Sequence, residues 1–407
     1  MVIGMAVSPS SYQFQELPQG LELVAPFGRF RVHTGIAVGR CCEVYEGEGL
    51  SGGGGRGCEG VPASPAVPGR SAEGGVLPQG LGHSRAPIVR HFGELQWRGR
   101  DILVQELLGP TLKEVLLSQQ PRPSSEWLVA TLTTHMLRGL QHLHAKGVVH
   151  GDLKPPNILW DAESATFKFI DFGVSFTTSE ALTHAVQSKG YQAPECVVWE
   201  SAVAEGSEDS LESAQQPGTA ADIWSAGCVV VECLLSRQLF PGGADCDDVP
   251  ASLRSALTSE TSKTYFTRKY LNDSYQFLLR CTQLCPENRA TAKDLLEDPW
   301  LQQCPRPIFY DLLNFPTRVL RFLYVTEPHP YPPLAEEVED ILVELCAKHG
   351  VVEGHCLEAS LGNVYVCFRS HRHAESALDH LTDLYFMRQM LTPTFFPLDC
   401  WIRREFF

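Results

Sequence analysis

The middle of the chain contains the stretch His150-Gly151-Asp152-Leu153-Lys154-Pro155-Pro156-Asn157, and Asp171-Phe172-Gly173 follows it. Further along come Gly190-Tyr191-Gln192-Ala193-Pro194-Glu195 and Asp222-Ile223-Trp224-Ser225-Ala226-Gly227, and then Arg289. Each of these motifs is common by chance when it stands alone. Because all of them occur in one order and at one characteristic spacing, they indicate a single chemistry for this part of the chain.

The motifs resemble those of the eukaryotic protein kinase family over residues 28–303. The resemblance implies transfer of the ATP γ-phosphate to a protein hydroxyl, a reaction that depends on positioning and charge neutralisation. It implies that Asp152 accepts the proton of that hydroxyl and that Lys154 neutralises the γ-phosphate. Lysine at this place is the serine/threonine-kinase pattern, so we expect serine and threonine to be the acceptors.

The same resemblance assigns the other site residues. Mg²⁺ is a hard cation that prefers oxygen ligands, and the resemblance gives it Asn157 and Asp171. These two residues would contact ATP together with Gly39, Val44, Glu106 and Leu108. Structural roles fall to His150, Ser188, Glu195, Asp222 and Arg289. In these roles Ser188 touches Asp152, Glu195 pairs with Arg289 in a buried ion pair, and Asp222 holds the catalytic loop.

Gly151 departs from the family pattern, which usually has Arg before the catalytic Asp. That Arg normally pairs with a phosphate on the activation loop, so its absence predicts no requirement for loop phosphorylation. Thr177, Thr178 and Thr183 are then expected to be ordinary loop residues.

The front of the kinase-like region is degenerate. The first lysine of the chain is Lys113, so the strand lysine that contacts the α- and β-phosphates in the family is missing. Only Gly39 remains of the three glycines expected before Val44. Residues 47–87 contain 13 Gly and 5 Pro, a composition that predicts disorder. Three explanations stay open: a true pseudokinase, an arginine that substitutes for the lysine, or an aberrantly spliced exon, which the abrupt change at Gly47 favours.

Helices are expected from Ser124 or Ser125 onward and over residues 219–236, 274–284 and 291–303, with a solvated loop at 200–218. After the prolines that break the last helix, the pattern changes. Strands are predicted at 319–325, 364–368 and 391–396, and helices at 336–348 and 374–381. This order suggests a split βαβ fold of the RNA-recognition-motif (RRM) type.

Residues 317–407 resemble the UHM, an RRM variant that binds peptides in place of RNA. Arg321 and Asn363 stand where RNA readers have aromatic residues, and 8 basic residues face 13 acidic ones, the wrong balance for phosphates. The resemblance implies a basic, Trp-containing peptide ligand, held by Glu336, Glu337, Glu339, Asp340 and Phe386. Leu384 replaces the Arg of the family's Arg-x-Phe motif. For any one of the acidic residues, a merely solvated helix face is an equally good interpretation.

The sequence therefore predicts an α+β chain in which a bilobal protein-kinase fold with a degenerate N-lobe precedes an RRM-like, ferredoxin-like split βαβ domain. The predicted regions are a tail (1–27), the N-lobe (28–108, with 47–87 disordered), the C-lobe (109–303), a linker (304–316) and the UHM (317–407). The net charge of −15 argues against strong RNA binding and against a polybasic membrane anchor. No C-x-x-C pair indicates a zinc site.

The predicted function is a serine/threonine kinase that uses ATP and Mg²⁺. The resemblance implies protein substrates of the stathmin or splicing-factor type with serine before proline, and splicing-factor peptides as UHM partners. It also implies a monomer in the nucleus, with some in the cytoplasm. The alternative is a catalytically impaired pseudokinase adaptor that binds UHM-ligand peptides. The missing lysine favours the adaptor, whereas Asp152, Asn157 and Asp171 favour the enzyme.

Overall fold

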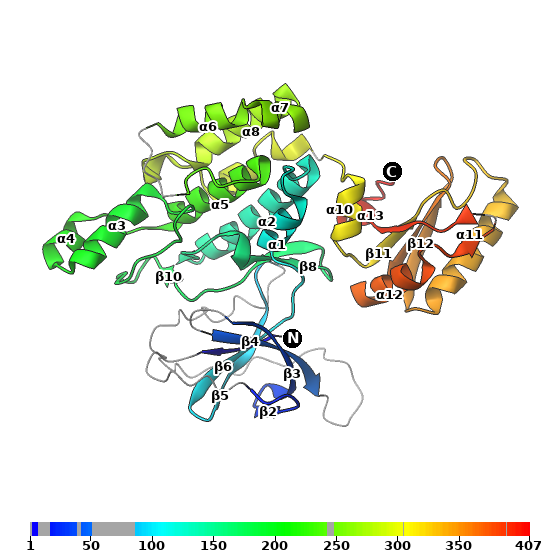
Figure 1. Cartoon of the computed structure of the whole chain (residues 1–407), viewed down its shortest axis with the longest axis horizontal. Helices are drawn as coiled ribbons and strands as arrows, with labels where there is room; N and C mark the ends of the chain where they lie inside the picture. The colour runs from blue at the N-terminus through cyan, green and yellow to red at the C-terminus, as the bar shows by residue number, and fades with distance from the viewer. Residues whose placement is uncertain are drawn as a thin grey trace.

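The computed structural model describes residues 2–6, 17–38, 42–50, 86–241, 248–303, 305–387 and 389–407. It consists of a β-sheet lobe, a helical lobe and a C-terminal module that lies beside the helical lobe (Figure 1). Within these residues, no helix is both long enough and apolar enough to cross a membrane.

The first lobe is built on a six-stranded sheet with the order β2-β3-β4-β1-β6-β5. Its strands are β1 (Val2–Ala6), β2 (Glu22–Ala25), β3 (Gly28–Val38), β4 (Cys42–Leu50), β5 (His91–Trp97) and β6 (Arg100–Gln105). Side chains that alternate along three of these strands form its core: Phe30, Val32, Tyr45, Ile102 and Val104. The short strand β1 lies between β4 and β6 and is antiparallel to both.

This sheet corrects two predictions about the front of the chain. Residues 1–27 are not a tail, because β1 and β2 both belong to the sheet. The predicted disordered segment does not begin at residue 47, because residues 47–50 continue β4 and pair with β3. The remaining core of that segment, 51–85, lies outside the described residues, and so does Gly39.

The second lobe is largely helical. Its longest elements are α2 (Glu126–His144), α5 (Thr219–Leu235) and α8 (Arg268–Cys281). The other helices are α1 (Leu112–Gln119), α3 (Pro194–Glu205), α4 (Glu208–Ser213), α6 (Val249–Leu257), α7 (Glu260–Tyr265), α9 (Ala292–Leu296), η3 (Pro286–Asn288) and η4 (Leu301–Gln303). Ser125 caps α2 by accepting a hydrogen bond from the Leu128 amide, as its place before the apolar repeat predicts.

Three predictions about this lobe need correction. The segment 200–218 is not a simple loop, since α3 and α4 occupy most of it and Gly206 ends α3 in the left-handed conformation (φ 68°). The helix predicted at 274–284 begins six residues earlier, at Arg268, where Thr267 caps it. The helix predicted at 291–303 is two short pieces, α9 and η4.

The C-terminal module has the element order β-α-β-β-α-β. Its elements are β11 (Val319–Phe322), α11 (Pro332–Ala347), β12 (Val352–Glu358), β13 (Asn363–Phe368), α12 (His371–Leu381) and β16 (Pro393–Phe395). The four strands form an antiparallel sheet with the order β12-β13-β11-β16. A small hairpin of β14 (Tyr385–Phe386) and β15 (Gln389–Met390) precedes β16, and α13 (Leu398–Arg403) follows it.

Both faces of this sheet are covered. Val364, Val366 and Phe368 of β13 point to the face that α11 and α12 cover, whereas Tyr365 and Cys367 alternate with them on the opposite face. The second face packs under α13 and the segment that ends at Phe407. Neither β12 nor α13 was predicted from the sequence, because β12 contains Gly354 and α13 spans fewer than two turns.

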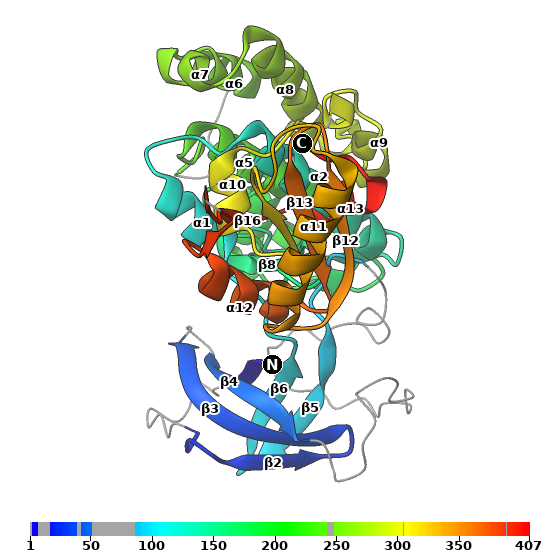
Figure 2. The ribbon, with the colours of Figure 1, turned by 90° about the vertical axis from the view of Figure 1, so that its right-hand side faces the viewer.

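The predicted linker 304–316 contains a helix, α10 (Phe309–Asn314), and it anchors the module to the helical lobe (Figure 2). Phe315 is 2% exposed and packs against the rings of Trp127, Trp160 and Phe167. The Trp160 indole donates a hydrogen bond to the Pro316 carbonyl oxygen (2.8 Å).

A polar contact extends the same interface. The Glu163 carboxylate accepts hydrogen bonds from the His371 amide (3.1 Å) and from its imidazole Nδ1 (2.8 Å). This carboxylate of the helical lobe therefore interacts with the first turn of α12, and it raises the pKa of the His371 imidazole.

Phe315→Ala should weaken this anchor, since it leaves a cavity among three aromatic rings. We expect a loss of about 3–5 kcal/mol in the free energy of unfolding, measured by denaturant titration. Phe309→Ala is the matched control, because Phe309 begins the short helix α10 that Phe315 follows, but it is 52% exposed and its loss should change stability little. Equal stability of the parent and both variants would contradict this description of the interface.

Asp311 predicts a pH effect on the same anchor. Burial raises the pKa of this carboxyl from 3.8 to about 6, although hydrogen bonds from Ser125 and the Ile308 amide oppose the change. Its stabilising contribution is therefore complete below pH 3.8 and is lost as the pH rises through 6. Asp311→Asn should gain stability over the parent between pH 5 and pH 7.5 in paired thermal melts. A constant difference between the two proteins over that range would disprove the effect.

Candidate active site

The catalytic loop follows β7 (Val148–Val149) and leads into the 3-10 helix η2 (Pro155–Asn157) and the hairpin of β8 (Ile158–Asp161) and β9 (Thr166–Phe169). Within it, Lys154 Nζ lies 2.7 Å from Asp152 Oδ2 and donates to Ser188 Oγ at 2.8 Å. Ser188 Oγ in turn donates to Asp152 Oδ1 at 2.7 Å. The three side chains thus form a closed triangle around a partly exposed carboxylate that can accept a proton.

Asn157 and Asp171 supply two further oxygen ligands, and the Ile170 amide next to Asp171 donates to the Asn157 carbonyl oxygen at 3.0 Å. The Asn157 amide nitrogen donates to the Asp152 carbonyl oxygen (2.9 Å) and approaches its carboxylate (3.3 Å), so Asn157 Oδ1 is available as a ligand. Asp171 is exposed, in the left-handed conformation (φ 61°), and accepts from the Gly173 amide. One amide oxygen and one carboxylate suit Mg²⁺, which takes its other ligands from phosphate and water.

The Asp222 carboxylate orients the backbone of the catalytic loop. Its carboxylate is fully buried and accepts hydrogen bonds from the His150 amide (2.8 Å), the Gly151 amide (3.0 Å) and His144 Nε2 (3.0 Å). Although burial alone acts to raise its pKa, the contributions of His144 and His150 together outweigh burial, and the pKa of Asp222 lies below its ordinary value.

His150 links the loop to the segment that carries Asp171. Its Nδ1 accepts from the Asp152 amide (3.2 Å), so the proton is on Nε2, which donates to the Ile170 carbonyl oxygen (3.1 Å). The ring also packs against Phe172, with centroids 4.9 Å apart. His150 therefore fixes the relative positions of the two functional aspartates.

Glu195 and Arg289 form the ion pair that ties the activation segment to the helical lobe. The two guanidinium nitrogens lie 2.5 and 2.7 Å from the two carboxylate oxygens. Arg289 also lies over the Trp224 ring, with Cζ 5.1 Å from its centroid. Such a bidentate, buried pair holds its partners in one geometry.

The predicted ATP contacts of the front lobe are only partly available. Val44 is half-buried on β4, and Leu108 packs against the core of the helical lobe. The Glu106 carboxylate is engaged, since it accepts from the Arg90 amide and from Lys168 Nζ, both at 2.7 Å. An ATP contact at Glu106 is therefore left to its backbone. Lys168, which also pairs with Asp161, was missed by the sequence analysis because it lies in no recognised motif.

In the C-terminal module, the acidic residues of α11 are mostly exposed. Glu336, Glu337 and Asp340 face solvent, whereas Glu339 pairs with His355 at 2.8 Å. Phe386 is only 6% exposed and belongs to the core of the module, so it is not an open pocket wall. The exposed side chains beside it are Tyr385 (69%) and Leu384 (38%).

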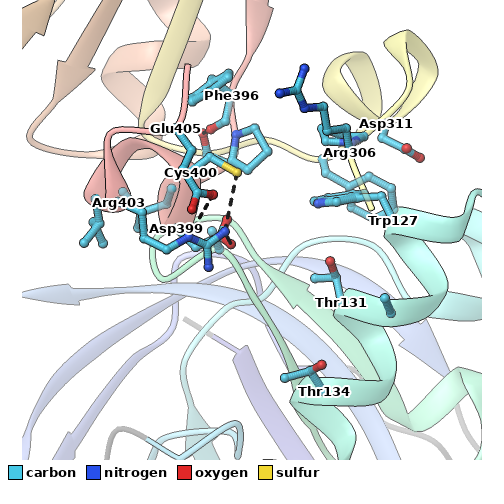
Figure 3. A pocket seen from close by; sticks show the side chains of 18 of the residues that line it. Trp127, Thr131, Thr134, Arg306, Asp311, Phe396, Asp399, Cys400, Arg403 and Glu405 are labelled. Atoms are coloured by element: carbon cyan, nitrogen blue, oxygen red, sulfur yellow. Dashed lines mark hydrogen bonds and ion pairs between the residues drawn. The ribbon is translucent and has the colours of Figure 1, made fainter. Parts of the chain in front are cut away.

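A separate cavity of about 1020 Å³ lies between the helical lobe and the module, away from the catalytic loop. In Figure 3, Trp127, Thr131 and Thr134 of α2 line one side, and Cys400 and Arg403 of α13 line the other. Arg403 is paired with Asp399 on the same helix and with Glu405, which follows the helix. None of the catalytic-loop residues lines this cavity.

Comparisons with known proteins agree with this geometry. Residues 81–301 match the protein kinase domain family. The serine/threonine-protein kinase Kist of Homo sapiens is 30% identical over 368 residues, which cover 85% of this chain and 84% of the relative. Kist of Mus musculus is 29% identical with the same coverage. The mitogen-activated protein kinase HOG1 of Hortaea werneckii is 31% identical over 224 residues, or 49% of this chain and 57% of the relative. The chain therefore belongs to the protein kinase family and is a serine/threonine-protein kinase of the Kist-like kind.

Proposed function

We propose that this chain transfers the γ-phosphate of ATP to serine or threonine side chains of proteins in the presence of Mg²⁺. The observation that carries the proposal is the triangle of Asp152, Lys154 and Ser188, whose three contacts are all between 2.7 and 2.8 Å. A carboxylate held in this way is oriented before any substrate binds, which is the positioning that phosphoryl transfer requires.

Each residue has a definite task in this reaction. Asp152 hydrogen-bonds the incoming hydroxyl and accepts its proton, while the Lys154 ammonium offsets the negative charge of the γ-phosphate. Asn157 Oδ1 and the Asp171 carboxylate would hold Mg²⁺, which, when bound, neutralises charge on the phosphate oxygens. Asp222 and His150 keep these groups in register through the loop backbone.

A second candidate function is a pseudokinase adaptor. The observation that favours it is the sequence of β1, Val-Ile-Gly-Met-Ala, which occupies the centre of the front sheet without a cationic side chain. The family's strand lysine is missing from the chain before Lys113. Removing one electrostatic contact to a reacting group typically costs about 10²–10³ in rate. We therefore propose slow transfer rather than none.

We further propose that residues 317–407 are a UHM that binds short basic peptides with a tryptophan, such as those of splicing factors. The β-α-β-β-α-β order and antiparallel sheet support this proposal. The sheet face that RNA readers use is filled by the chain itself, since Arg321 Nη1 and the Tyr365 hydroxyl both donate to the Phe407 carbonyl oxygen. The acidic side of α11 stays exposed.

The remaining proposals come from similarity to the Kist kinases. We propose that the substrates are proteins of the stathmin or splicing-factor type and that the phosphorylated serine precedes a proline. We also propose that the chain is a monomer and is located in the nucleus, with some in the cytoplasm. In this picture the UHM brings partner proteins to a kinase lobe to which it is anchored by Phe315 and Glu163.

Radiolabel transfer from ATP to a Ser-Pro peptide tests the enzyme directly. The parent should label the peptide in the presence of Mg²⁺, and Asp152→Asn should lower the rate about 10²–10⁴-fold, because it removes the proton acceptor. Asp209→Asn, an exposed residue of α4, is the control for loss of one negative charge. No labelling by well-folded parent, or equal labelling by Asp152→Asn, would favour the adaptor.

Titration calorimetry with a basic Trp-containing peptide tests the UHM. Glu336→Gln with Glu337→Gln should weaken binding and flatten its salt dependence, since exposed charges act over a Debye length of about 8–10 Å. Leu384→Arg should tighten binding, because it restores the family pattern at a position exposed on the surface. Asp399→Asn on α13 is the control for loss of an acidic charge elsewhere on the module. If neither the parent nor Leu384→Arg binds the peptide, the module is not a working UHM.

A further inference from the structure

Gln187 joins three parts of the helical lobe. It lies in the activation segment, directly before Ser188, and its backbone amide donates to the Gly151 carbonyl oxygen at 2.7 Å. Its side-chain Nε2 donates to the Ala221 carbonyl oxygen and to Ser225 Oγ, both at 2.8 Å on α5. Its Oε1 accepts from the Ala193 amide at 2.7 Å.

These hydrogen bonds use both protons of the side-chain amide and one lone pair of its oxygen. A side chain of this length that offers two donors and an acceptor on one planar group is characteristic of glutamine. Gln187 also has a positive φ of 69°, which is uncommon for a residue other than glycine and implies that the surroundings hold it there. Ser225 Oγ donates onward to the Tyr191 carbonyl oxygen (2.8 Å), so the network spans the end of the segment.

Other protein kinases can hold the activation segment by an arginine before the catalytic Asp that pairs with a phosphorylated side chain. In this chain the backbone at residue 151 does not accommodate such a side chain. Gly151 has a φ of 76°, and a Cβ atom placed on it would lie 2.9 Å from the Val174 carbonyl oxygen. A side chain at residue 151 would therefore be strained, and the loop instead uses its carbonyl oxygen to hold the Gln187 amide.

The start of the segment is held independently. Strand β10 (Phe176–Thr177) pairs with β7, and the Thr178 amide donates to the Gly147 carbonyl oxygen at 2.8 Å. Gln187 therefore governs the other end, where Ser188 contacts Asp152 and Lys154.

We propose that Gln187 is a positioning residue that locks the end of the activation segment onto the catalytic loop without phosphorylation, and so places Ser188 on Asp152. The expected effect of Gln187 on the reaction rate rests on the proposed transfer reaction. Its effect on the position of the activation segment does not depend on catalysis.

Two variants separate the side chain from the backbone. Gln187→Gly accepts the positive φ but removes the three side-chain hydrogen bonds, and Gln187→Glu keeps the shape while losing both donors. Both should lower kcat about 10-fold while KM for ATP stays within about two-fold, since Gln187 acts through Ser188 and Asp152 and not on the nucleotide. Thr183→Ala, an exposed residue of the same segment, should leave kcat unchanged.

Hydrogen exchange gives a readout that needs no activity. The amides of residues 187–193 should exchange at least about 10-fold faster in Gln187→Gly than in the parent, and those of Phe176 and Thr177 should not change. If the parent transfers no phosphate, the proposed function fails and this exchange difference alone decides the lock. Unchanged exchange, or a kcat loss explained entirely by a smaller folded fraction, would overturn it. So would a kcat of the parent that falls on phosphatase treatment.

Discussion

The arrangement of the catalytic lobe depends on one buried carboxylate, that of Asp222. A charge with no exposed surface is costly unless hydrogen bonds compensate it, and here the compensating donors are His144 and the amides of His150 and Gly151. Meeting this requirement fixes the backbone on which Asp152 and Lys154 stand. The Gly151 carbonyl oxygen then points to Gln187, so the activation segment inherits its position from the same interaction.

The two lobes contribute unequally to the charged residues of the candidate site. The helical lobe supplies Asp152, Lys154 and Asn157 in one hydrogen-bonded set, and Asp171 follows Ile170, whose amide donates to the Asn157 carbonyl oxygen. The front sheet is complete as a sheet, because β1 fills the place between β4 and β6, but this strand has no cation. In the proposed reaction, nucleotide affinity would therefore come mainly from the helical lobe and from the metal that its oxygen ligands suit.

The sequence motifs predicted the kinase fold, and the comparisons confirm the family. The motifs could predict the fold because their charged residues contact one another between rigid elements. This holds for the catalytic loop and for Glu195, Asp222 and Arg289. The position of β1 could not be predicted, since a five-residue strand pairs with partners far along the chain and its local pattern does not select those partner strands. Three further features could not be predicted, because each depends on residues that are distant in the sequence. They are the burial of Phe386, the ion pair of the Glu106 carboxylate with Lys168 and the side-chain hydrogen bonds of Gln187.

We propose that the helical lobe holds the nucleotide through magnesium, because β1, which lies between β4 and β6 in the front sheet, has no cationic residue. The most direct measurement is the thermal shift of the full chain with ATP, with and without Mg²⁺, for the parent and for Asp171→Asn. We expect ATP to stabilise the parent only when Mg²⁺ is present, and this stabilisation to be lost in Asp171→Asn. Equal stabilisation with and without Mg²⁺, or an unchanged shift in Asp171→Asn, would contradict it.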